Sequence, residues 1–81
     1  MTGNDVTGGD RGRRQAYYEF WVRGQLGETM RSAFPGLHAR RSDHDTVLSG
    51  VLPDQAALHG VLAEIEALGL ELLEIRRYPP R

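Results

Sequence analysis

The sequence predicts an α+β fold built from four strands and two helices around one core. Three observations lead to this fold class. The chain has 81 residues, which provide material for one hydrophobic core but not for two. Several segments alternate apolar and polar residues with the period of a strand, whereas one segment repeats apolar residues with the period of a helix. Gly, Pro and Asp residues separate these segments, as is typical of turns.

The start of the chain differs in composition from the rest. Residues 1–15 contain four glycines, three arginines and, apart from Met1, only one large apolar residue. So few apolar side chains do not offset the entropy lost on ordering, and we therefore expect a flexible N-terminal tail. Its arginines, Arg11, Arg13 and Arg14, indicate either a solubilising leader or an electrostatic arm for an acidic partner. Residues 16–81 are then expected to form the single domain.

The first strand is expected at residues 17–23, where aromatic and β-branched residues alternate with polar ones. Tyr18, Phe20 and Val22 share one face, which is apolar and is therefore predicted to join the core. The other face of this strand carries four residues: Tyr17, Glu19, Trp21 and Arg23.

The middle of the chain predicts a short helix followed by a β-hairpin. Leu26, Met30 and Phe34 recur four residues apart, which indicates a helix that is ended by the following Pro-Gly pair. A second strand is expected at residues 37–42 and a third at residues 46–52. The Ser-Asp-His-Asp sequence between them has the composition of a hairpin turn.

The second helix has the most regular pattern in the sequence. Asp54 precedes it as an N-cap, and Gly69 follows it where a left-handed C-terminal cap belongs. Its apolar residues form one stripe at helical spacing: Leu58, Val61, Leu62, Ile65 and Leu68. A fourth strand is expected at residues 70–78, with Leu73 and Ile75 facing the core, before Pro residues end it.

Gly60 lies inside this helix, where glycine costs about 1 kcal/mol relative to alanine. It belongs to a strip of small residues with Ala56, Ala63 and Ala67. Either the close approach of another backbone explains this glycine, or glycine is simply tolerated here.

The predicted order of elements is β-α-β-β-α-β, which is the order of a ferredoxin-like split βαβ sandwich. In that arrangement two helices cover one face of a four-stranded antiparallel sheet and leave the other face, hereafter the open face, uncovered. The first and third strands are central, so we expect Trp21 near the middle of the open face.

Strand periodicity predicts which side chains reach the open face. The third strand is ambiguous, because it offers either Val47, Ser49 and Val51 or Leu48, Gly50 and Leu52. Ser42 and Leu72 are also expected on this face. The candidate interaction residues are Tyr17, Glu19, Trp21, Arg23, His38, Arg40, Glu74, Arg76 and Tyr78. Glu19 and Glu74 are placed to pair with Arg76, Arg23 or Arg40 across strands.

Trp, Tyr and Arg are typical anchors of protein interfaces, and an exposed aromatic face indicates an interaction site. We therefore predict a non-catalytic module that associates with itself as a homodimer or with another protein as an accessory subunit. The alternative is an ordinary sheet surface that the N-terminal tail or residues 78–80 partly cover.

Charge and hydropathy argue against two other classes of partner. The formal net charge is −1, and all ten basic residues are arginine. An isoelectric point near 6.3 argues against a general nucleic-acid binder, and the aromatic signature of RNA-recognition sheets is absent from the sequence. The sequence contains neither an apolar run long enough to span a membrane nor a secretory signal, so we expect a cytoplasmic protein.

The sequence predicts no catalytic residues, no metal ligands and no cofactor. Cysteine is absent, and the three histidines (His38, His44 and His59) share no spacing typical of a metal site. A cofactor-independent enzyme is a further alternative, in which His38, Arg40 and Trp21 would be the reactive groups. This alternative is based on fold analogy alone.

Residues 46–62, followed by the segment from Leu72 to Arg77, resemble small uncharacterised actinobacterial proteins. The resemblance extends over most of residues 16–80 and implies no particular activity. The topology is also similar to that of ACT-type regulatory domains, with Gly24 or Gly27 as a loose counterpart of their first loop glycine. That similarity implies a small-ligand-binding regulatory domain as the alternative function.

Overall fold

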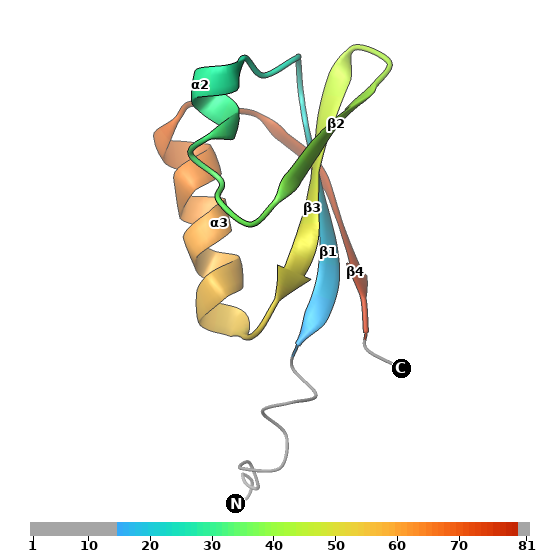
Figure 1. Cartoon of the computed structure of the whole chain (residues 1–81), viewed down its shortest axis with the longest axis vertical. Coiled ribbons are helices and arrows are strands. Elements are labelled where there is room, and N and C mark those ends of the chain that lie inside the picture. The colour runs from blue at the N-terminus through green and yellow to red at the C-terminus, as the bar shows by residue number, and fades with distance from the viewer. Residues whose placement is uncertain (1–14, 80–81) are drawn as a thin grey trace, which may run out of the picture.

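The computed structural model describes residues 15–79 and shows an α+β fold, as predicted. The predicted N-terminal tail, with its three arginines, lies outside the described residues apart from its last position. The elements are β1 (Ala16–Val22), α2 (Glu28–Arg31), β2 (His38–Ser42), β3 (Asp45–Leu52), α3 (Gln55–Ala67) and β4 (Leu72–Tyr78). Both helices lie on the same side of the sheet, so no helix of residues 15–79 covers the opposite side (Figure 1).

The strands form one antiparallel sheet in the order β2-β3-β1-β4. β3 and β1 are therefore central, and β2 and β4 are the two edges. Phe20 of β1 lies directly opposite Leu48 of β3, so these two side chains share the helix-covered face. This register resolves the ambiguity of the third strand, because Val47, Ser49 and Val51 must then face the open side.

The core lies between β1, β3 and α3. Tyr18, Phe20 and Val22 are all buried, which confirms the predicted core face of the first strand. Leu48 from β3 and Ile65 from α3 join them in one cluster. The remaining residues of the α3 stripe, Leu58, Val61, Leu62 and Leu68, are partly buried and pack against this cluster.

The predicted short helix is present as α2, but it comprises only Glu28–Arg31, so Leu26 and Phe34 lie outside it. Beyond it the chain continues in tight turns, in which the N–H groups of Ala33 and Phe34 donate to carbonyls three residues earlier. Phe34 precedes a proline, which disfavours the α-helical backbone at that position. Leu26 and Phe34 still pack against the core, although both lie outside the helix.

The termini of α3 follow the prediction. The Asp54 carboxylate accepts a hydrogen bond from the backbone N–H of Ala57 at 2.9 Å, so Asp54 is the N-cap. At the other end Gly69 has φ = +73°, the left-handed conformation that a glycine adopts without strain.

β4 departs from the predicted alternation at its first residues. The register with β1 shifts between Trp21 and Val22, which places Leu72 opposite Val22 and against the core. The prediction that Leu72 faces the open side is therefore wrong, and a bulge is the reason. Leu73 and Ile75, predicted to face the core, remain 40% and 39% exposed because β4 is an edge strand.

Candidate functional site

The open face is organised as rows of side chains that lie opposite one another across the strands. One row contains Val51, Tyr17 and Tyr78, the next His38, Ser49, Glu19 and Arg76, and the third Arg40, Val47, Trp21 and Glu74. Strand order and register thus bring eight of the nine predicted residues onto one face. The exception is Arg23, which follows β1 and pairs instead with Glu71 at 2.8 Å.

Trp21 lies at the centre of the open face, as predicted. The prediction that its ring is freely exposed is wrong, because Trp21 is half-buried. The guanidinium carbons of Arg40 and Arg76 lie 5.7 Å and 5.2 Å from the centre of the Trp21 ring, within cation–π range. Val47, which is opposite both Trp21 and Arg40, is fully buried on this helix-free side. Long arginine side chains therefore cover the middle of the sheet.

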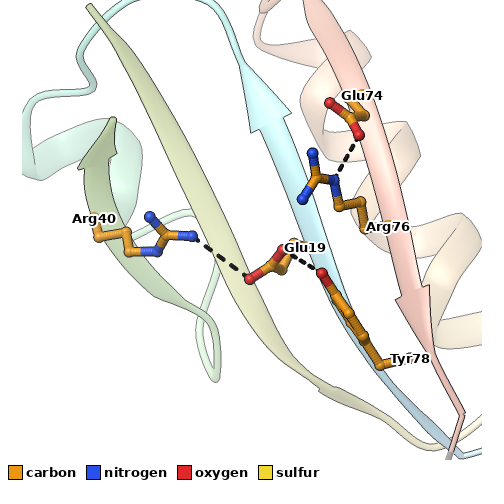
Figure 2. Close-up of polar contacts among 5 residues, drawn as sticks. All are labelled: Glu19, Arg40, Glu74, Arg76 and Tyr78. Atoms are coloured by element: carbon orange, nitrogen blue, oxygen red, sulfur yellow. Dashed lines mark hydrogen bonds and ion pairs between the residues drawn. The ribbon is translucent and has the colours of Figure 1, made fainter. Parts of the chain in front are cut away.

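Glu19 links the two sides of this face, as Figure 2 shows. One of its carboxylate oxygens accepts a hydrogen bond from the Tyr78 hydroxyl at 3.2 Å, and the other lies 3.5 Å from an Arg40 Nη atom. Arg76 donates from Nε to Glu74 at 2.6 Å. Of the predicted carboxylate–arginine pairs, the structure therefore contains Glu19–Arg40 and Glu74–Arg76.

The charged state of Arg76 follows from these contacts. The hydrogen bond to Glu74, followed by that to Tyr78, raises the pKa of Arg76 above its ordinary value. Arg76 is therefore a cation over the Trp21 ring at neutral pH, as arginine is in proteins generally.

The first row differs from the other two because it contains no charged side chain. Val51, Tyr17 and Tyr78, hereafter the apolar row, are 55%, 39% and 43% exposed. The two tyrosine rings contact each other, with centroids 5.8 Å apart. Sequence reasoning identified both tyrosines but left Val51 open, because both faces of β3 are apolar and only the strand register distinguishes them.

A family model described as a domain of unknown function, DUF8691, matches residues 17–76. The chain belongs to this family. The DUF8691 match begins in β1 and ends in β4, so it includes seven of the eight candidate residues gathered on the open face. Neither a curated protein nor a solved structure matches the chain.

A second feature of this DUF8691 chain is an apolar pocket of about 400 Å³ on its helix side. The α2–β2 connection, the end of β3 and the first half of α3 line it, and Glu64 supplies a carboxylate. None of His38, Arg40 and Trp21 lines this pocket, so the residues suggested for a cofactor-independent enzyme do not meet there.

The three histidines lie on separate elements: His38 on β2, His44 in the hairpin turn and His59 on α3. Residues 15–79 contain no group of three or more His, Asp or Glu side chains able to hold a metal ion. In the same part of the chain, no helix is both long and apolar enough to cross a membrane.

Proposed function

We propose that this DUF8691 chain is a non-catalytic protein-association module, working as a homodimer or as an accessory subunit through the open face of its sheet. The observation that carries this proposal is the apolar row. Three adjacent side chains with large apolar surfaces remain exposed on a face where arginine side chains cover the central tryptophan. Contiguous exposed apolar surface of this kind is typical of interaction sites.

The overall arrangement supports the same proposal. The element order and the strand order β2-β3-β1-β4 favour a ferredoxin-like split βαβ sandwich, in which the helices cover one face only. Among residues 15–79, the open face is then an extended surface that no helix covers (Figure 1). A cytoplasmic location and the actinobacterial relationship expected from the sequence remain predictions.

The simplest occupant of the open face is a second copy of the chain. The apolar row is uncharged, so two copies that meet row to row about a two-fold axis bring no like charges together there. Beside the row, Glu19 is already satisfied by Tyr78 and Arg40, so its burial leaves no unpaired carboxylate. An apolar patch flanked by paired polar groups is the usual composition of a protein interface.

Val51→Arg tests this proposal, because it places a charge in the apolar row where the side chain is 55% exposed and folding is little affected. Trp21 is the only tryptophan, so its fluorescence reports on the open face. We expect the Trp21 emission of the wild type to change with protein concentration, and Val51→Arg to reduce that change.

The matched control is His59→Arg, which adds the same side chain at an exposed position of α3 on the other side of the molecule. It is expected to behave like the wild type. Emission that is independent of concentration, with Val51→Arg and wild type indistinguishable, would refute contact between copies through the open face.

The helix-side pocket supports a second candidate function, that of an ACT-like small-ligand-binding regulatory domain. Its volume of about 400 Å³ lies within the range of small-molecule sites. A ligand bound there raises the melting temperature by mass action. Increases with amino acids or other metabolites, together with an unchanged Trp21 emission, would favour this second function over the first.

A further inference from the structure

β4 is an exposed sheet edge with properties that the other edge does not share. It has seven residues, against five in β2, and every residue after Leu72 is exposed. An edge strand presents unpaired backbone N–H and C=O groups, which makes it a template for pairing with another strand.

The direction of these backbone groups follows from the β2–β3 hairpin. Ser42 and Asp45 flank a two-residue turn, so they form a pair that exchanges both backbone hydrogen bonds. In antiparallel sheets such pairs alternate with pairs that exchange none, and the observed registers carry this alternation across β3 and β1 to β4. Because of this alternation, the N–H and C=O groups of Glu74 and Arg76 point toward β1, and those of Ile75 point toward the open edge.

The charges of Glu74 and Arg76 distinguish the pairing registers centred on residues 74, 75 and 76. Glu74 and Arg76 both point to the open face and lie on either side of Ile75. In an antiparallel pair centred on Ile75, Glu74 of each copy lies directly opposite Arg76 of the other. Centring the pair on Glu74 or on Arg76 instead places like charges opposite each other, which is destabilising.

In the Ile75-centred register, four charges alternate in sign around the two-fold axis. Each Arg76 then lies between its own Glu74, which it already contacts at 2.6 Å, and Glu74 of the second copy. These side chains are about half exposed in the single chain, so the pairing requires little additional desolvation.

Apolar surface at the same edge favours the same register. Ile75 is 39% exposed and lies on the helix side, opposite Phe20. In the Ile75-centred pair, the isoleucines of the two copies lie opposite each other and remove this apolar surface from water. Nearby, α3 and the start of β4 leave a shallow apolar hollow of about 260 Å³.

β2 lacks this self-complementarity. A two-fold pair centred on Arg40 or on Arg41 places that arginine opposite its own copy, and one centred on Ala39 offers Arg40 no carboxylate partner. Exposed charges of one sign are a common protection of sheet edges against pairing.

We propose that two copies of this chain pair through β4, antiparallel and centred on Ile75, to form one continuous sheet of eight strands, four from each copy. The backbone pairing lies at the sheet edge rather than across the open face of the proposed function, although Glu74 and Arg76 of that face contribute their charges to it, and it leaves the two open faces side by side on one surface. Because a single pair of strands buries a small area, the dimer is of the weak, concentration-dependent class.

Charge reversal tests the proposal, and Val51→Arg serves as the parent protein so that contact through the open face does not contribute. Sedimentation equilibrium measures the dimer dissociation constant. Glu74→Arg gives four positive charges around the axis and Arg76→Glu four negative ones, so each is expected to raise the constant at least ~10-fold. The double exchange, E74R with R76E, restores alternating charges and is expected to restore the dimer.

Ile75→Pro provides a second variant that does not depend on charge. It removes an N–H that points away from β1, and proline is tolerated in an edge strand at such a position. We expect a folded monomer with the circular dichroism spectrum of the parent, whereas Ile75→Val should remain dimeric.

The proposal is overturned if the parent is monomeric at every concentration, if the single reversals leave the constant unchanged, or if the double exchange dimerises as weakly as the single variants. Failure of the proposed function is read separately, by comparing the wild type with Val51→Arg. A Trp21 emission whose dependence on concentration is absent in both proteins, or equal in both, refutes contact through the open face, because β4 pairing brings Arg76, beside the Trp21 ring, into the contact and is not affected by Val51→Arg. Either contact is therefore able to fail while the other stands.

Discussion

Replacing Phe20 with alanine is expected to lower the free energy of unfolding by about 3–5 kcal/mol, the largest stability effect that we predict for a single substitution. The Phe20 side chain is fully buried on the central strand β1, opposite Leu48, and its ring stacks on that of Tyr18 at a centroid distance of 5.9 Å. Removing it leaves a cavity between the sheet and α3 that β1 is unable to close, since β3 and β4 hold it on both sides.

The size of this effect relative to the whole domain makes it easy to measure. At about 0.05–0.15 kcal/mol per residue, a chain of this length has a total stability of about 4–12 kcal/mol. Phe20→Ala therefore removes a large part of it, and urea denaturation followed by circular dichroism should show a much lower midpoint than in the wild type.

Tyr17→Ala is the matched control, because it truncates another aromatic side chain of the same strand on the opposite face. Tyr17 loses its contact with Tyr78, which is worth about 0.5–1.5 kcal/mol for an aromatic pair. A loss for Tyr17→Ala as large as that for Phe20→Ala would contradict the assignment of the two faces.

The sequence predicted well those elements whose pattern of apolar and polar side chains is compatible with only one secondary structure and one buried face. In β1, apolar and mixed residues alternate, so Phe20 had to face the core and Trp21 the opposite side. In α3, the stripe that includes Ile65 has helical spacing, and Asp54 and Gly69 mark the two ends by local backbone chemistry. These features depend on neighbours in the chain, which a sequence displays directly.

The features that were missed depend on contacts between distant segments. β3 is apolar on both faces, so only its pairing with β1 shows that Val51 lies on the open face. The bulge that turns Leu72 to the core arises from the pairing of β4 with β1 and has no local signature in the sequence. From Leu26 to Phe34 the apolar residues have helical spacing. Turns are equally able to direct these side chains into the core, so the spacing does not require a helix over the whole segment.

The sequence predicted which residues lie on the open face, but not which of them expose apolar surface there. Strand periodicity and the order of elements place Trp21, Arg40 and Arg76 near one another. Neither reveals that both arginines fold over the tryptophan ring, because arginine side chains are long and adopt many rotamers. As a result, the exposed apolar surface lies at the Val51 end of the face rather than at its centre, and that is why our test of function targets Val51.

Gly50→Val is expected to destabilise the protein by about 1–3 kcal/mol, the cost of inserting methyl groups into a closely packed site. A Cβ atom at Gly50 would lie 2.7 Å from Leu37 Cδ2 and 3.0 Å from the carbonyl oxygen of Gly36. Valine favours strands, so propensity alone would predict a gain in stability at this central position. The expected loss therefore isolates the close approach of the α2–β2 connection to β3.

Gly60→Ala is the matched substitution at the glycine where the sequence suggested a close backbone approach. Outside the backbone of its own helix, nothing lies within 4 Å of a Cβ atom at Gly60, so the close approach in this fold occurs at Gly50 instead. Alanine in α3 should then raise the free energy of unfolding by up to about 1 kcal/mol.

Urea denaturation of both variants measures the change in the free energy of unfolding, which is expected to be negative for Gly50→Val and positive for Gly60→Ala. A neutral Gly50→Val would show that the α2–β2 connection yields to the added methyl groups, and a destabilising Gly60→Ala would show that a second chain packs closely against α3 at this position.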